Sequence, residues 1–146
     1  MQIIQVTTAE VAQVAPLFDQ YRVFYQQPSD PALAYAFIAE RVANRESEIF
    51  LAMEEHEPVG FTQLYPSFSS VSARRTWILN DLFVEPSCRG QGVGRALLER
   101  ARLHALETGV KGIGLQTAMD NINAQRLYEA LGYQRSEGFY SYFLAL

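Results

Sequence analysis

A glycine-rich segment has residue types and spacing that favour binding of an anion: Arg89-Gly90-Gln91-Gly92-Val93-Gly94-Arg95. It follows an apolar run that ends at Val84 and precedes an amphipathic stretch, so we expect it to join a strand to a helix. The first N–H groups of a helix have no intrahelical acceptors, and glycines let an anion approach the backbone closely. With an arginine at each end, the segment predicts a phosphate site.

Two other phosphate-binding motifs do not fit this segment. A dinucleotide fingerprint that starts at Gly90 needs a third glycine at position 95, where the chain has Arg95. A P-loop needs Gly-Lys followed by Ser or Thr, which the segment lacks. An ordinary tight turn before a helix remains an alternative interpretation, because glycines are common in such turns.

The apolar pattern of the rest of the chain predicts the elements that position this segment. Expected strands cover residues 2–6, 48–53, 59–65, 75–84, 113–117 and 139–146, and expected helices cover about 8–21, 33–44, 92–108 and 122–131. Only the part from 79 to 117 has the strand–helix–strand order of a parallel pair with a right-handed crossover. Because open sheets bind ligands beyond the carboxyl ends of their strands, the turn after Val84 is the expected ligand site.

Composition argues against several classes of function. The 146 residues carry a formal net charge of -4 without a face-sized cluster of Lys and Arg, which disfavours nucleic acid or anionic membrane as a partner. Cys88 is the only cysteine, so neither an intrachain disulfide nor a Cys-cluster metal site is expected. No apolar run approaches the roughly 20 residues of a membrane helix, and no secretion signal is recognisable. We expect one cytoplasmic domain over residues 1–146.

The two histidines offer no metal site in the sequence. His56 falls in an expected turn and His104 on a helix face, and neither has a second ligand at a useful spacing. We interpret both as structural or surface residues and expect no metal.

Two ordered motifs resemble those of the GNAT family of N-acetyltransferases. Arg89-x-x-Gly92-x-Gly94, after the strand end Leu82-Phe83-Val84, resembles the acetyl-CoA signature of that family. A later block resembles the family's late segment: Asn121-x-x-Ala124-x-x-Leu127-Tyr128-Glu129-x-Leu131-Gly132-Tyr133. The order of elements is similar over nearly the whole chain, while close motif identity is limited to 82–98 and 121–133.

The resemblance implies a fold and a co-substrate. The expected fold is mixed α/β, with a mostly antiparallel central sheet of about seven strands, a parallel strand pair splayed around the cofactor, and about four flanking helices. The expected co-substrate is acetyl-CoA. By resemblance, the residues that hold it are Leu82, Phe83, Val84, Arg89, Gly90, Gln91, Gly92, Val93, Gly94, Arg95, Asn121 and Tyr128.

The implied reaction is transfer of acetyl from acetyl-CoA to a primary amine of a small molecule or to an exposed amino group, directly through a tetrahedral intermediate. Tyr128 is the candidate general acid for the CoA thiolate, although it shares an apolar helical stripe and also suits a partly buried aromatic. A backbone N–H near Phe83 and Val84 is the expected oxyanion donor. Asn121 also suits a helix N-cap.

Acceptor residues are expected on the central strand and near the first helices. Asp81 is a candidate base and ligand for a cationic amine, with a solvated edge residue as the alternative interpretation. The small-amine and polyamine acetyltransferases of the family have paired acids where this chain has Asn80 and Asp81, so one acid of that pair is absent. Tyr25 is expected to border the acceptor pocket, and core packing explains its aromatic cluster equally well.

Assembly and activity have further expectations. A homodimer follows from the resemblance, and the segment 139–146 offers a strand that pairs across a two-fold axis. A non-catalytic acyl-CoA-binding or regulatory module is the alternative to the enzyme. An interaction domain with an incidental glycine turn is a third interpretation, and it predicts no stabilisation by CoA.

Overall fold

Two units make up the chain in the computed structural model, which describes all 146 residues. The first unit is Met1–Leu115 and the second is Gln116–Leu146. The expectation of one domain over residues 1–146 stays a prediction. None of the helices is both long enough and apolar enough to cross a membrane.

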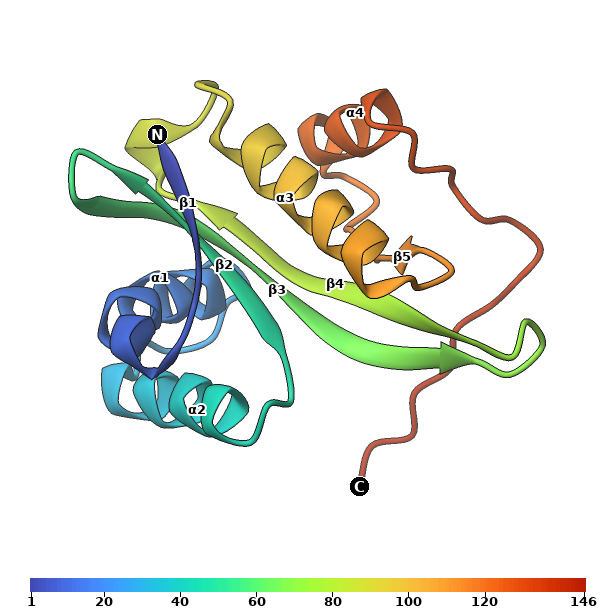
Figure 1. Ribbon diagram of the computed structural model, residues 1–146, viewed down its shortest axis with the longest axis horizontal. Helices are drawn as coiled ribbons and strands as arrows, with labels where there is room; N and C mark the ends of the chain where they lie inside the picture. The colour runs from blue at the N-terminus through green and yellow to red at the C-terminus, as the bar shows by residue number, and fades with distance from the viewer. The chain divides into compact units, whose positions relative to one another are not determined.

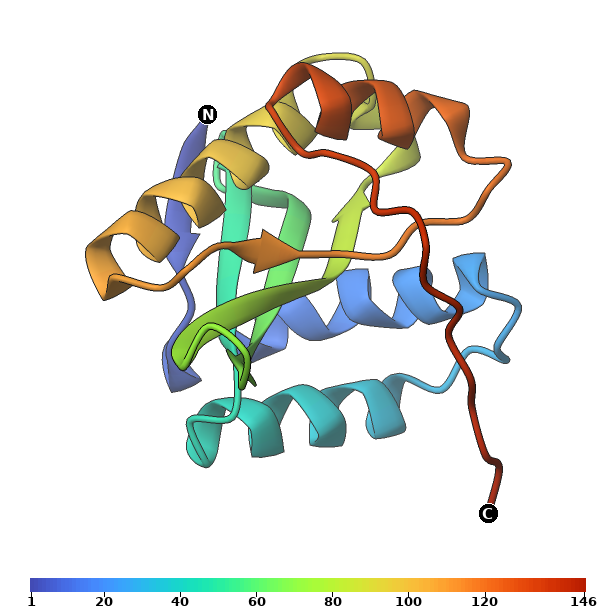
Figure 2. The same ribbon diagram turned by 90° about the vertical axis from the view of Figure 1, so that its right-hand side faces the viewer.

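The first unit is a five-stranded sheet with helices on both faces (Figure 1). Its strands run in the order β1-β2-β3-β4-β5, and only β4 and β5 are parallel. Figure 2 shows the same sheet from the side, with α1 and α2 on one face and α3 on the other. The bounds are β1 Gln2–Gln5, α1 Val11–Phe24, α2 Pro31–Ala43, β2 Glu48–Glu54, β3 Glu57–Ser69, β4 Arg74–Val84, α3 Val93–Thr108 and β5 Ile113–Gly114.

Local capping residues explain where the first helices begin. Thr7 and Glu10 form a capping box at a short 3-10 turn that leads into α1. Asp30 caps α2 by accepting a hydrogen bond from the Leu33 amide, and Pro31 occupies the first helical position. Both helices then bury their apolar faces in one core with β2, β3 and β4, built around Val14, Leu17, Ile38, Leu51, Phe61 and Phe83.

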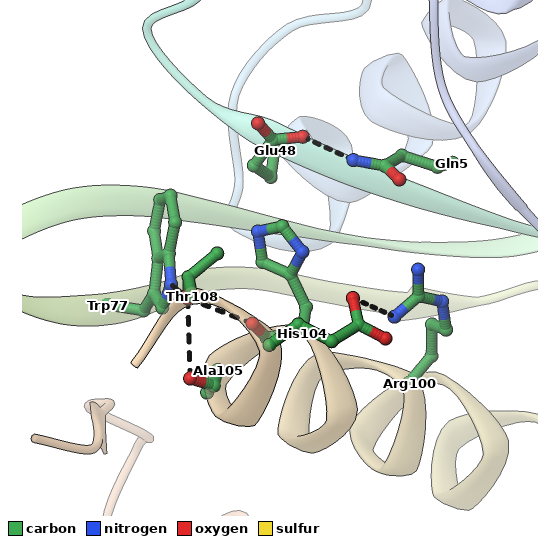
Figure 3. Close-up of polar contacts among 8 residues, drawn as sticks. Gln5, Glu48, Trp77, Arg100, His104, Ala105 and Thr108 are labelled. Atoms are coloured by element: carbon green, nitrogen blue, oxygen red, sulfur yellow. Dashed lines mark hydrogen bonds and ion pairs between the residues drawn. The ribbon is translucent and has the colours of Figure 1, made fainter. Parts of the chain in front are cut away.

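The other face of the sheet is covered by α3, and His104 lies in that interface (Figure 3). Its ring packs against Phe50 and Trp77, with centroids 5.3 Å and 5.2 Å away. The Trp77 indole donates to Thr108 Oγ1, and this hydroxyl donates to the His104 carbonyl. Burial lowers the pKa of the imidazole, so it packs as a neutral ring. His104 is therefore a structural residue and not a surface one.

The second unit contains one helix, α4, Ile122–Ala130. Asn121 caps it by accepting a hydrogen bond from the Ala124 amide, as a helix N-cap is expected to do. The predicted strand at 139–146 is wrong, because no strand forms there and its large apolar side chains are exposed. Alternating apolar residues suit pairing but do not specify a neighbour to pair with.

The number of strands also differs from the expectation. The sheet has five strands and not about seven, and β5 covers only 113–114 of the predicted 113–117. It pairs with Trp77 and Ile78 and then leaves β4. The fold is nevertheless the expected mixed α/β arrangement, with a mostly antiparallel sheet, one parallel pair and four helices.

Gly60 sets the distance between β3 and the start of α3. A Cβ atom at this position would lie 2.9 Å from the Phe83 carbonyl oxygen and 3.2 Å from Val93 Cγ1. We expect Gly60→Ala to lower the free energy of unfolding by about 1–3 kcal/mol, because a buried backbone oxygen cannot give way. Urea denaturation measures this change.

Gly114→Ala is the matched control for that substitution. Gly114 lies in β5, and no heavy atom is within 4 Å of its added Cβ. Its free energy of unfolding should change by no more than about 0.5 kcal/mol. Equal effects of the two substitutions would contradict the tight contact at Gly60.

Candidate functional site

The turn between β4 and α3 presents backbone N–H groups without helical acceptors. Gly90 and Gly92 have φ angles of 77° and 86°, a region that favours glycine. Gly92 is the N-cap of α3 and has no side chain to cap the helix, and the first helical bond runs from the Ala96 amide to the Gly92 carbonyl. The amides of 92–95 therefore have no helical acceptors at this end of α3, where the helix dipole favours an anion.

Space and charge around the turn fit a diphosphate. No heavy atom lies within 4 Å of a Cβ added at Gly90 or Gly92, so the backbone is open to an approaching group. Arg95 is exposed on the first turn of α3. Backbone amides at a helix end together with an exposed guanidinium are suited to an anionic group such as a diphosphate.

Arg89 and Gln91 have their side chains on the protein itself. Arg89 Nε donates to the Val84 carbonyl at 2.9 Å, and its guanidinium lies over the rings of Phe83 and Phe24, 5.5 Å and 5.8 Å from their centroids. Gln91 Nε2 donates to the Ser87 carbonyl at 3.3 Å. Arg89 thus ties the loop to the end of β4, whereas Gln91 bonds within the connection itself, to a residue before the glycines.

The carboxyl-terminal half of β4 has one edge without a strand partner. The Glu85 amide donates to the Val59 carbonyl, so on the β3 side the hydrogen-bonded pairs include Glu85 and, two residues earlier, Phe83. Backbone groups alternate along a strand, which directs those of Leu82 and Val84 to the other edge. Since β5 pairs only as far as Ile78, this edge can bind an extended ligand or an oxyanion.

A bulge at Asn80 precedes this open edge. Gln63 pairs with Asp81 and Leu64 with Leu79, so Asn80 is an extra residue of β4 without a partner in β3. After the bulge, Asp81 points into the protein and is only 2% exposed. The interpretation of Asp81 as a solvated edge residue is therefore wrong.

The Asp81 carboxyl is surrounded by neutral donors. Gln63 Nε2 donates to Oδ2, and Asn80 Nδ2 donates to Oδ1 at 2.7 Å. Burial raises the pKa of this carboxyl, and hydrogen bonds from Asn80, Gln63 and Tyr21 oppose the rise. No Lys, Arg or His forms an ion pair with it. A buried carboxyl without a counter-charge is a suitable environment for a cationic group.

Aromatic side chains lie beside this carboxyl on α1 and β3. The Tyr21 hydroxyl donates to the Asn80 carbonyl at 3.2 Å, and its ring meets Tyr25 edge to face at 4.9 Å. Tyr25 is half exposed at the end of α1. Burial, followed by the nearby Asp81 charge, raises the pKa of Tyr21 and raises that of Tyr65 to about 12, so both phenols stay neutral donors.

Sequence reasoning did not single out Gln63 or the contact of Tyr21 with the bulge. Gln63 has the only side-chain amide in the apolar run 59–65. A polar side chain in such a run indicates a buried hydrogen bond and could have drawn attention to Gln63. Its partner, however, depends on strand register, which that pattern does not determine. No group of three or more His, Cys, Asp or Glu side chains in the chain could hold a metal ion.

Tyr128 lies on α4 in the second unit. Its side chain is half buried, and its ring centroid is 5.8 Å from that of Tyr133. The two late site residues of the prediction, Asn121 and Tyr128, thus lie on the same helix, with Asn121 as its N-cap.

Comparison with known proteins gives the family. Residues 14–133 match the model of the acetyltransferase (GNAT) family. The uncharacterized N-acetyltransferase YhfO of Bacillus subtilis is 50% identical over 144 residues, which cover 99% of this chain and 97% of that protein. The thialysine N-epsilon-acetyltransferase of Bos taurus is 33% identical over 87 residues, which cover 58% of this chain and 51% of the bovine protein.

A crystal structure of a probable acetyltransferase has the same fold. It superimposes with a TM-score of 0.93 at 40% sequence identity and covers 100% of this chain and 98% of its own. The family match and the near full-length relative agree with the open β4 edge and the glycine turn. The chain therefore belongs to the acetyltransferase (GNAT) family and is an acyl-CoA-dependent N-acyltransferase.

Proposed function

We propose that this enzyme transfers an acetyl group from acetyl-CoA to a primary amine of a small molecule or to an exposed amino group. The observation that carries the proposal is the unpaired edge of β4 leading directly into the uncapped amino end of α3. An edge of backbone donors suits an extended amide-containing chain, and the helix end suits its phosphates. Both features fit the pantetheine arm and pyrophosphate of CoA.

The proposed roles on the cofactor side follow from the described geometry. The backbone of Leu82 and the amide of Val84 hold the pantetheine arm, and an amide of this edge stabilises negative charge on the thioester oxygen, while the Val84 carbonyl accepts from Arg89. The amides of 92–95 and the Arg95 side chain hold the pyrophosphate. Arg89 and Gln91 act through the loop, since their side chains already bind the backbone of Val84 and Ser87.

Tyr128 is proposed as the general acid that protonates the departing thiolate. A phenol O–H can donate its proton to the departing sulfur. Asn121 caps the same helix and is proposed to contact the pantetheine arm as well. Support for both roles comes from the motif that these residues share with the family.

Asp81 is proposed to attract the acceptor as an ammonium ion and to take its proton through water. An alkylamine with a pKa near about 10 is mostly protonated at neutral pH, so it must lose a proton before it can attack. The carboxyl lies beside Tyr21, whose ring contacts the half-exposed Tyr25. These two aromatic residues are proposed to border the acceptor.

Assembly and compartment are part of the same proposal. A homodimer is supported by six exposed large apolar side chains at the carboxyl end, Phe139, Tyr140, Tyr142, Phe143, Leu144 and Leu146, which are a suitable surface for a second copy. The single cysteine agrees with a cytoplasmic setting.

Substitution of two glycines at opposite ends of α3 tests the phosphate site. Gly92 and Gly109 both have positive φ angles, and neither has a heavy atom within 4 Å of an added Cβ. Replacing either glycine with alanine should therefore lower the free energy of unfolding by a similar amount, about 1–2 kcal/mol. Only Gly92→Ala should also weaken CoA binding, by about tenfold or more, when titrated by calorimetry. Equal CoA affinities of the two variants would contradict the site.

Replacement of Tyr128 tests the general acid. Tyr128→Phe should lower kcat by about 10²-fold or more, because the thiolate then leaves without a proton donor. Release of free thiol from acetyl-CoA with a panel of amines measures kcat, and CoA affinity should change little. Tyr133→Phe is the control, since that ring packs against Tyr128 in the same unit. A full rate in Tyr128→Phe would refute the role, and CoA binding without turnover in the parent enzyme would indicate a non-catalytic module.

The raised pKa of Asp81 predicts a pH dependence of stability. A carboxyl whose pKa is higher in the folded state stabilises the fold below its unfolded pKa, and that contribution is lost as the pH rises through the folded pKa. Asp81→Asn keeps the shape without ionising. The variant should therefore gain stability relative to the parent as the pH rises from about 4 through the Asp81 titration, measured by urea unfolding. A constant difference across this pH range would contradict the raised pKa.

A further inference from the structure

The Asp81 carboxyl is held by a side chain from the neighbouring strand. Gln63 Nε2 donates to Asp81 Oδ2, and the two side chains are 0% and 2% exposed. The two residues lie directly opposite each other in β3 and β4, as the pair next to the bulge at Asn80. The register of β3 against β4 therefore places the Gln63 amide against the Asp81 carboxyl, and burial keeps both side chains in place.

Ser47 determines which end of the Gln63 amide faces the carboxyl. Its hydroxyl, in the loop before β2, donates to Gln63 Oε1 at 2.8 Å. With the carbonyl end occupied, the amide NH₂ is left for Asp81. A reversed amide would place its oxygen against a carboxylate oxygen, which is unfavourable for an ionised Asp81.

The other groups that face Asp81 are neutral. Asn80 of β4 donates to Oδ1, and two phenols lie nearby: Tyr21 of α1, whose hydroxyl donates to the Asn80 carbonyl, and Tyr65 of β3. Arg41 of α2 interacts with Tyr65 and forms its ion pairs with Glu40 and Glu46. Donors to a carboxylate favour its charged form, and in a buried site they replace the missing cation.

We propose that Gln63, oriented by Ser47, is a positioning residue that keeps the Asp81 carboxylate aligned and ionised to receive the proton of the acceptor amine. This inference rests on the function proposed above. In the step concerned, an N–H bond of the ammonium breaks and an O–H bond forms on Asp81 through water. The products are a neutral amine and a neutral carboxyl, and no other reactant is needed.

Gln63→Leu and Thr62→Val form a matched pair for the test. Thr62 is also fully buried in β3, but its hydroxyl donates to the backbone carbonyl of Asp81 and not to the carboxyl. Titration of the Asp81 carboxyl carbon by NMR, assigned with Asp81→Asn, gives its midpoint in the free protein. Gln63→Leu should raise this midpoint by about one pH unit or more, and Thr62→Val should leave it in place.

In Gln63→Leu, the low-pH limb of the pH profile of kcat/KM should also shift to higher pH, together with that midpoint. Ser47→Ala should move both in the same direction by a smaller amount, and it supplies the test if Gln63→Leu does not fold. An unchanged midpoint in folded Gln63→Leu or Ser47→Ala would overturn the inference. So would a shifted midpoint with an unmoved low-pH limb, since the reaction would then not use this carboxylate. If no amine is acetylated, the proposed function fails, whereas the NMR midpoint still reports on Gln63.

Discussion

The bulge at Asn80 is the feature on which the rest of the site depends. One extra residue in β4 changes which groups of the strand face β3 and which face the opposite edge. Asp81 then lies against Gln63 in the interior, while the backbone of Leu82 and Val84 faces an edge that β5 has already left. Without the extra residue, the groups that follow position 80 would face the opposite way, because one residue reverses the alternation of a strand.

Sites suited to charges of opposite sign thus lie at two different positions, one beyond the end of β4 and one within it. At its carboxyl end, helix amides and an exposed arginine favour an anion, and a few residues earlier a buried carboxyl without a counter-charge favours a cation. Acetyl-CoA is anionic and a protonated amine is cationic. In the proposed reaction, each substrate would therefore meet an environment of opposite charge, and polar neighbours hold the carboxyl without neutralising it.

Local signals in the sequence were sufficient for much of this fold. Glycines before an amphipathic stripe correctly predicted the start of α3 near Gly92, and the apolar run correctly predicted the end of β4 at Val84. The mixed α/β class and the GNAT family were also confirmed. These features depend on short-range propensity and on motifs that lie close together in the chain.

Features that depend on pairing between distant residues were not predictable in the same way. The bulge, the burial of Asp81 and its contact with Gln63 require the register of β3 against β4, which alternation does not determine. The expected strand at 139–146 failed for a related reason, because a suitable pattern without a neighbour gives no strand. Arg89 was expected to bind the phosphate. Its contacts with the Val84 carbonyl and with two aromatic rings depend on the three-dimensional fold and could not be predicted from the sequence.

Amide NMR shifts on titration with CoA test the central claim most directly. If the open strand edge and the helix end hold this cofactor, the amides of Leu82, Val84 and 92–95 should shift together and saturate at one affinity. The amide resonances of β1 and β2 should not shift, since β3 separates these strands from β4. Saturating CoA that leaves 82–95 unshifted, or shifts only residues elsewhere, would contradict the account.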